Sequence, residues 1–223
     1  MKNIVEELLS IADNKYKKFN ENLVKGNSPI IGVKIPKLRL MAKDIIKNNL
    51  IDDFMNNYEG IYFEEKLIKG VIIANDEDLF NKYVDDYLKE LDSWCLVDTF
   101  CNSCKFIDNN KEKYWIFIKK LINSKEEFII RCGYVLLLNY YIDDEYIKEV
   151  TDLLQIEYDF YYVNTAIAWC ISEAFINYST VIEKLLTKKI LNEFVQNKAI
   201  DKIYDSYRVD IETKVRLRDL KYF

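Results

Sequence analysis

Residues 128–138 read Phe-Ile-Ile-Arg-Cys-Gly-Tyr-Val-Leu-Leu-Leu. The run is apolar apart from Arg131, and it is shorter than the ~18 residues expected of a membrane-spanning helix. It predicts a helix that carries one conspicuous charge. Because burying an unpaired guanidinium costs about 3–5 kcal/mol, Arg131 must reach water, a carboxylate or an anion.

Helical runs of 10–17 residues, separated by short polar breaks, follow one another along most of the chain. They pair into hairpins at steps of 32, 33, 34 and 30 residues, with expected starts near Ile61, Ser93, Glu126, Phe160 and Ile190. A near-constant step is typical of an α-solenoid of stacked antiparallel helical hairpins. We therefore predict an all-α fold with a single domain over residues 1–223, of which residues 61–223 form five hairpin repeats. A compact helical bundle is the alternative.

Residues 1–58 are expected to form N-terminal helices and a basic loop. Apolar residues at helical spacing fill the first 23 positions, with a break near Asp13. A turn-rich stretch follows at residues 26–32, and Pro36 fits the first turn of a helix that runs to about Asn48. Further along the chain, Thr180 and Glu183 have the spacing of a capping box.

The composition excludes several kinds of chemistry. With no histidine among its 223 residues, the chain cannot hold a Ser-His-Asp triad, a Cys-His pair or a histidine metal ligand. Five glycines and two prolines are too few for a sheet with many tight turns. Any chemistry must come from carboxylates, lysines, tyrosines, cysteines or an external cofactor.

The cysteines favour a reducing compartment. They are five in number and follow no secretory leader, so we expect reduced thiols in the bacterial cytosol, at the nucleoid. Cys101 and Cys104 form one C-x-x-C pair, which would share a helix face. A structural zinc site needs four ligands, usually from a second such pair, so we expect neither a metal nor a cofactor.

Positive charge is concentrated in two regions of an acidic protein. The chain has a net charge of −5, yet residues 15–47 carry nine positive and two negative side chains. The C-terminal end is basic again. Two basic regions flanking an acidic middle fit a nucleic-acid binder, and chance clustering on a lysine-rich surface is the alternative.

Four polar or aromatic residues stand out on the helical scaffold. Trp94, Arg131 and Trp169 lie 1, 5 and 9 residues after their expected hairpin starts, and Asp98 lies one helical turn after Trp94. Such offsets share one helix face, so these side chains would line one surface across three repeats. Core packing of the tryptophans, a helix-start preference of Asp98, and a structural Asp98–Arg131 ion pair are the alternatives.

Five segments resemble, in order, the motifs of one family. Gly32 to Pro36 with Arg39 resembles its L-G-I-x-x-P segment, and Ser93 to Asp98 resembles its S-W-W-D-T-V-D stretch. Arg131 matches its R-R motif, Trp169 its A-I-G-W motif, and residues 215–220 its basic C-terminal helix. The family is that of the AlkD-type DNA alkylation repair enzymes, glycosylases built from HEAT-like repeats, and the likeness spans nearly the whole chain. Departures from the motifs occur at Cys95, Leu96 and Cys132.

The resemblance implies a curved solenoid with a concave cationic groove. It also implies a monofunctional, metal-free glycosylase that excises 3-methyladenine and 7-methylguanine from duplex DNA. Asp98 would stabilise an oxocarbenium-like sugar and orient water, Trp94 and Trp169 would pack on the sugar, and Arg131 would hold a phosphate. We expect a monomer that is not bound to a membrane. The candidate contacts to the DNA backbone are Tyr16, Lys34, Lys37, Arg39, Arg208, Lys214, Arg216 and Arg218.

Two other functions are open on the sequence. One is a catalytically silent solenoid that binds DNA of unusual structure. The other is a protein-interaction scaffold with its acidic middle exposed to a partner. Salt-dependent binding to duplex DNA separates the first two hypotheses from the scaffold, and base release separates the enzyme from the silent binder.

Overall fold

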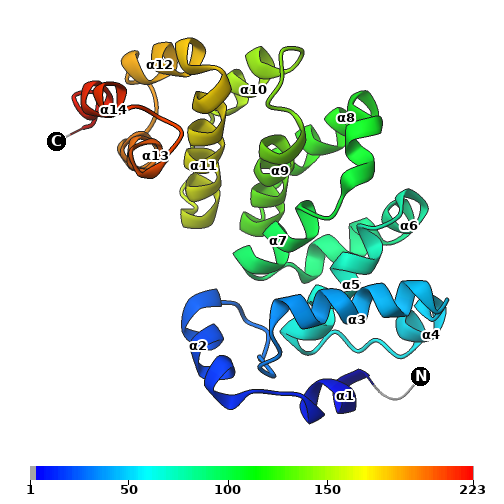
Figure 1. Ribbon diagram of the computed structural model, residues 1–223. Coiled ribbons are helices and arrows are strands. Elements are labelled where there is room, and N and C mark those ends of the chain that lie inside the picture. The colour runs from blue at the N-terminus through cyan, green and yellow to red at the C-terminus, as the bar shows by residue number, and fades with distance from the viewer. Residues whose placement is uncertain (1–3, 223) are drawn as a thin grey trace. The chain divides into compact units, whose positions relative to one another are not determined.

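The computed structural model describes residues 4–222, and this part of the chain is all-helical, without a strand. The helices gather into two compact units, one ending at Asn109 and the other beginning at Asn110. Figure 1 shows the course of the chain through both. The predicted single domain over residues 1–223, with one concave face, stays a prediction.

Unit 1 is built around α5, a helix that is almost wholly buried although it carries two glutamates and two lysines. Helices α3, α6 and α7 pack against it, and α1 also touches it. Phe80 of α6 and Phe100 of α7 stack with their ring centroids 5.8 Å apart, which anchors α7. The elements are α1 (Ile4–Ser10), α2 (Asn14–Val24), α3 (Ile35–Lys47), α4 (Ile51–Asn56), α5 (Phe63–Ile73), α6 (Glu77–Tyr87), η1 (Leu88–Glu90), α7 (Trp94–Cys101) and η2 (Lys105–Asn109).

Unit 2 has three long helices side by side in chain order, α9, α11 and α13 (Figure 1). Helix α8 packs on α9, α12 on α11 and α14 on α13. The apolar stretch of residues 128–138 lies in α9, where every residue from Ile130 to Leu137 is buried. The elements are α8 (Lys111–Ile122), α9 (Glu127–Tyr140), α10 (Ile147–Leu153), α11 (Tyr161–Asn177), α12 (Ser179–Thr187), α13 (Glu193–Asp205) and α14 (Ile211–Arg218).

The predicted all-α solenoid fold is confirmed, while the division of residues 61–223 into five hairpin repeats stays a prediction. The first helices of the five predicted repeats begin 31–34 residues apart, within three residues of the expected starts, at Phe63, Trp94, Glu127, Tyr161 and Glu193. Within each unit these helices pack on one another in chain order, which is the packing of an α-solenoid and not of a bundle. The N-terminal predictions also hold: α1 and α2 are separated at Asp13, and Pro36 lies in the first turn of α3.

Two local predictions are wrong. Helix α12 begins at Ser179 without a side-chain cap, so Thr180 already lies inside the helix. The Glu183 carboxylate instead accepts two hydrogen bonds from Arg216. Cys101 and Cys104 do not share a helix face, because α7 ends at Cys101 and Cys104 lies in the following turn. Both thiols are buried in the core.

Candidate functional site

Trp94 and Asp98 lie on one partly exposed edge of α7. Trp94 is the first residue of the helix, and its indole N–H points at the Leu23 carbonyl of α2, 3.4 Å away. Asp98 follows one turn later on the same side. The residues between them are buried, while Trp94 and Asp98 both keep contact with solvent. Since Asp98 lies beyond the first turn, a helix-start preference does not explain it.

Several predicted site residues of unit 1 gather around Cys95. Burial raises the pKa of the Cys95 thiol to about 11, Asp98 adds to the rise, and Arg39 opposes it. Burial also raises the pKa of Tyr16, with Cys95 contributing, while a backbone hydrogen bond from Ile35 opposes the rise. The structure thus brings Tyr16, Arg39 and Asp98 near one buried thiol, which stays protonated at neutral pH.

The two lysines predicted to contact DNA in unit 1 lie at the start of α3. Lys34 is the N-cap residue of the helix, and Lys37 is in its first turn. Both are exposed. Lys34 lies close enough to help lower the pKa of Asp13, although the backbone hydrogen bonds of Tyr16 and Lys15 to that carboxylate are the main causes. Exposed cations at such positions are free to meet an anionic surface.

A buried carboxylate holds the loop that carries these lysines. Glu64 of α5 is fully buried, and it accepts backbone hydrogen bonds from Ile31 (2.9 Å), Gly32 (2.7 Å) and Val33 (3.2 Å). Gly32 has a φ of +109°, and a Cβ there would lie 2.8 Å from both the Asp13 carbonyl oxygen and the Lys17 Cβ. The loop therefore needs both a glycine and an acid from another element. Sequence reasoning singled out the glycine and missed Glu64.

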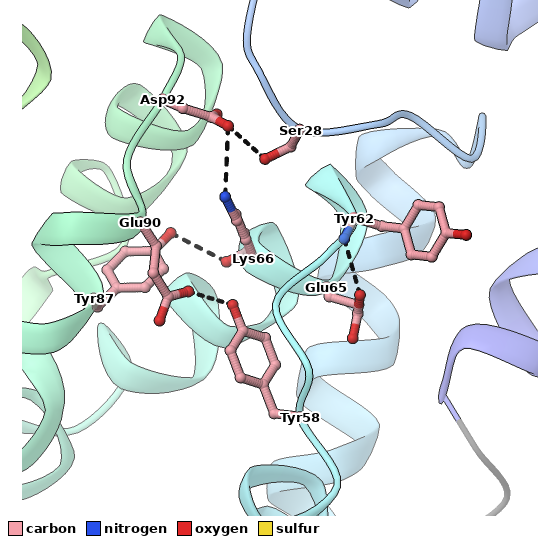
Figure 2. A network of polar contacts seen from close by, with 8 residues as sticks. All are labelled: Ser28, Tyr58, Tyr62, Glu65, Lys66, Tyr87, Glu90 and Asp92. Atoms are coloured by element: carbon pink, nitrogen blue, oxygen red, sulfur yellow. Dashed lines mark hydrogen bonds and ion pairs between the residues drawn. The ribbon is translucent and has the colours of Figure 1, made fainter.

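A second polar network ties the same loop to the segment before α7 (Figure 2). The Asp92 carboxylate accepts a hydrogen bond from the Ser28 hydroxyl and pairs with Lys66 of α5 at 3.5 Å. Alongside, Glu90 pairs with Lys69 at 2.6 Å and accepts a hydrogen bond from Tyr58. Since Trp94 begins its helix two residues after Asp92, the network fixes the loop relative to the Trp94–Asp98 edge.

Arg131 in unit 2 is almost completely buried, with 5% of its surface exposed. Its Nη1 donates to the backbone carbonyl of Tyr162 at 2.7 Å and to the Thr165 hydroxyl at 3.1 Å. The guanidinium thus joins α9 to α11, and the charge in the apolar stretch is solvated by the first turns of the next helix. Trp169 follows Thr165 by one turn on the same side of α11, so the residue that Arg131 binds is the i−4 neighbour of Trp169.

We predict that Arg131→Met will lower the free energy of unfolding by about 1–3 kcal/mol, because the Tyr162 carbonyl loses its charged donor. Chemical denaturation followed by circular dichroism will measure the change. The matched control is Arg218→Met, which removes an exposed arginine and should stay within about 0.5 kcal/mol of the wild type. Equal stability of both variants would show that Arg131 does not bind α9 to α11.

Trp169 is partly exposed and carries a cation on its face. The ammonium of Lys202, in the last turns of α13, lies 5.8 Å from the centroid of the indole. This lysine was missed by sequence reasoning, because it lies in a polar stretch with no distinguishing spacing. Trp115 differs from the other two tryptophans, since it packs against the rings of Tyr141 and Tyr146 at 5.2 and 5.0 Å.

The predicted C-terminal DNA contacts already have partners within unit 2. Arg208 pairs with Glu173 at 2.7 Å, and Arg216 forms a two-pronged pair with Glu183 at 2.9 and 3.0 Å. Lys214 and Arg218 both lie over the ring of Tyr204, at 5.7 and 5.3 Å. The exposed pairs are worth little to stability, so these cations remain available for exchange with an external anion.

Residues 4–222 contain no group of three or more cysteine, aspartate or glutamate side chains that could hold a metal ion. In the same span, no helix is both long and apolar enough to cross a membrane. All five cysteines are buried, and burial raises the pKa of Cys170 to about 12. These thiols are therefore core side chains.

The fold and the residues along it define a helical-repeat protein with a tryptophan–carboxylate edge in one unit and a buried arginine beside a tryptophan in the other. The family model described as DNA alkylation repair enzyme matches residues 4–203. The chain therefore belongs to the DNA alkylation repair enzyme family, as the motif resemblance indicated. No curated protein matches the sequence at a significant level.

Proposed function

We propose that the protein is a monofunctional DNA glycosylase that excises positively charged alkylated purines, such as 3-methyladenine and 7-methylguanine, from duplex DNA. The proposal is carried by the Trp94–Asp98 edge of α7, in a chain of the alkylation repair family. A carboxylate one turn from an indole, both in contact with solvent, offers an anion and a flat π-face to the same ligand.

The chemistry suits a protein without histidine. A purine alkylated on a ring nitrogen carries positive charge and leaves without protonation by a strong general acid. Its departure develops positive charge on the deoxyribose, which the Asp98 carboxylate stabilises while it orients the attacking water. The indole of Trp94 favours the same cation, and the indole of Trp169 offers a further face on which a sugar packs. Arg131 supports Trp169 through Thr165, one turn away on α11.

The backbone of the duplex would be held by the cations of both units. In unit 1 the contacts would come from Lys34 and Lys37, which are exposed, together with Tyr16 and Arg39. In unit 2 they would come from the four basic residues between positions 208 and 218. Since Arg208 and Arg216 first have to leave their carboxylate partners, their net contribution is smaller than that of an unpaired cation. An acidic protein of net charge −5 should therefore bind DNA with steep salt dependence.

The first test is release of 7-methylguanine from methylated duplex DNA at low salt. We expect the wild type to release the base. The logarithm of its affinity for the duplex should fall linearly with the logarithm of the salt concentration, with a slope of about −0.9 for each phosphate contacted. An unmethylated duplex is the control and should yield no free base. If the protein binds this duplex but releases nothing, the glycosylase proposal fails.

That outcome would favour the second candidate, a silent solenoid that binds DNA of unusual structure. The observation behind it is the set of motif departures beside the site. Cys95 and Leu96 are buried in α7, between Trp94 and Asp98, where the family motif has a tryptophan and an aspartate. If the protein binds no DNA at low salt, both candidates fail and a protein-interaction scaffold is favoured.

A further inference from the structure

Lys202 lies over the partly exposed indole of Trp169 in unit 2. Its position near the end of α13 places the ammonium 5.8 Å from the ring centroid, and the side chain is about half buried. An indole face attracts a cation but supplies neither a hydrogen-bond acceptor nor a compensating negative charge. The ammonium is thus held at one place without being neutralised there.

The charges around Lys202 come from three helices. Lys198, one turn earlier on α13, and Arg131 on α9 both disfavour its charged form, while Glu173 on α11 and Asp205 on α13 favour it. Burial is the largest influence, and the net effect lowers the pKa of Lys202. Within residues 4–222 no carboxylate lies at ion-pair distance from this ammonium. Glu173, the acid facing it from α11, is engaged by Arg208 at 2.7 Å.

Three arginines of unit 2 already have partners within the unit, and they must leave these partners before they bind an external anion. Arg131 is buried and donates to Tyr162 and Thr165, so it is poorly placed to take up an external ligand through the same Nη1. Arg208 and Arg216 are paired with carboxylates. Lys202 differs from all three, because a partly desolvated ammonium beside like charges gains most from a bound anion.

We propose that Lys202, assisted by Lys198, contacts a backbone phosphate of the nucleotide whose sugar packs on Trp169. This inference rests on the proposed function, and it moves the phosphate contact from Arg131 to Lys202. Arg131 is then a positioning residue that fixes α11, and Lys202 supplies the charge at the ligand. A lysine suits this role, since it presents a compact point charge to a single phosphate.

The test measures binding to a duplex with one tetrahydrofuran abasic site, a stable analogue of the product. Lys202→Met removes the charge and keeps an apolar side chain over Trp169. Its plot of log affinity against log salt should be shallower than that of the wild type by about 0.9, the loss of one phosphate contact. Lys202→Arg should restore the slope. The matched control is Lys188→Met, an exposed lysine at the end of α12, which should keep the slope of the wild type.

A second measurement changes the DNA and compares the wild type with Lys202→Met, whose fold is checked by circular dichroism. Single phosphates near the abasic site are replaced, one at a time, by neutral methylphosphonate. One replacement should weaken binding of the wild type but leave binding of Lys202→Met unchanged, because the two changes remove the same contact. The inference is overturned if every replacement weakens both proteins equally, or if Lys202→Met keeps the full slope. If the wild type releases methylated base while Lys202→Met is unaltered, only this inference fails; if the wild type binds no duplex, the proposed function fails with it.

Discussion

Asp98→Asn should release 7-methylguanine from duplex DNA about 10²–10³-fold more slowly than the wild type, the usual effect of removing one electrostatic group that acts on the transition state. The substitution preserves the shape of the side chain and its place one turn after Trp94. It removes the negative charge that would stabilise the oxocarbenium-like sugar and the oxygen that would orient water. Single-turnover release at low salt measures the step directly.

Three observations keep this prediction specific to Asp98. Asp108→Asn makes the same change at an exposed position in η2 of the same unit, and its rate of base release should equal that of the wild type. Circular dichroism and the unfolding midpoint should confirm that Asp98→Asn is folded. Its affinity for the undamaged duplex should be equal to or higher than that of the wild type, because a negative charge near phosphates has been removed. Excision by folded Asp98→Asn at the normal rate would disprove the assigned role.

Much of the fold could be predicted from the sequence, because local sequence patterns mark where each helix begins and ends. Polar breaks at regular steps place the first helix of each hairpin within three residues of where it begins. Asp13 caps α2 and Pro36 opens α3, both by chemistry that operates within a few residues of chain. Local rules failed where a distant residue competes for a side chain. Glu183 is engaged by Arg216 across 33 residues, so it does not complete a capping box.

The candidate site also contains residues that could be predicted from the sequence and residues that could not. Trp94, Asp98, Arg131 and Trp169 are visible in the sequence as residues that do not suit apolar helices. Lys202 could not be predicted from the sequence, because lysines are common in polar helices. Only its position over the ring of Trp169 in the structure distinguishes it. The supporting acids are hidden for a related reason. Glu64 and Asp92 would pass for acids at a helix start or in a loop, yet their partners lie some 30 to 60 residues away in the chain.

The loop of residues 26–33 shows why these acids matter to the site. It is anchored at Ser28 by Asp92 (Figure 2) and at its far end by Glu64. The second anchor lies directly before Lys34 and α3, whose first turn borders Tyr16. Exposed cations such as Lys34 take little part in the core, so their position depends on the backbone that carries them. A buried anion that holds this backbone therefore contributes to DNA binding without touching DNA.

Glu64→Ala should be the most destabilising single substitution considered for this chain. It leaves the buried N–H groups of Ile31, Gly32 and Val33 without their acceptor, and each such loss costs about 1–3 kcal/mol. We expect the free energy of unfolding to fall by at least about 3 kcal/mol, measured by urea denaturation. The free energy of unfolding of Glu64→Gln should lie between those of the wild type and Glu64→Ala. In this variant one amide oxygen replaces two carboxylate oxygens, and the amide nitrogen faces a backbone donor. The matched control is Glu59→Ala, an exposed acid before α5, expected to stay within about 0.5 kcal/mol of the wild type.

The ranking of the variants tests the cause as well as the size of the effect. If the carboxylate acts by accepting backbone hydrogen bonds, stability should fall in the order wild type, Glu64→Gln, Glu64→Ala, and amide exchange at Ile31, Gly32 and Val33 should accelerate in the same order. Affinity for duplex DNA should also drop in Glu64→Gln, although it removes a negative charge, because Lys34 loses its fixed position. A rise in affinity with unchanged exchange at these three amides would mean that the acid acts only through its charge, and would contradict its role as the anchor of the loop.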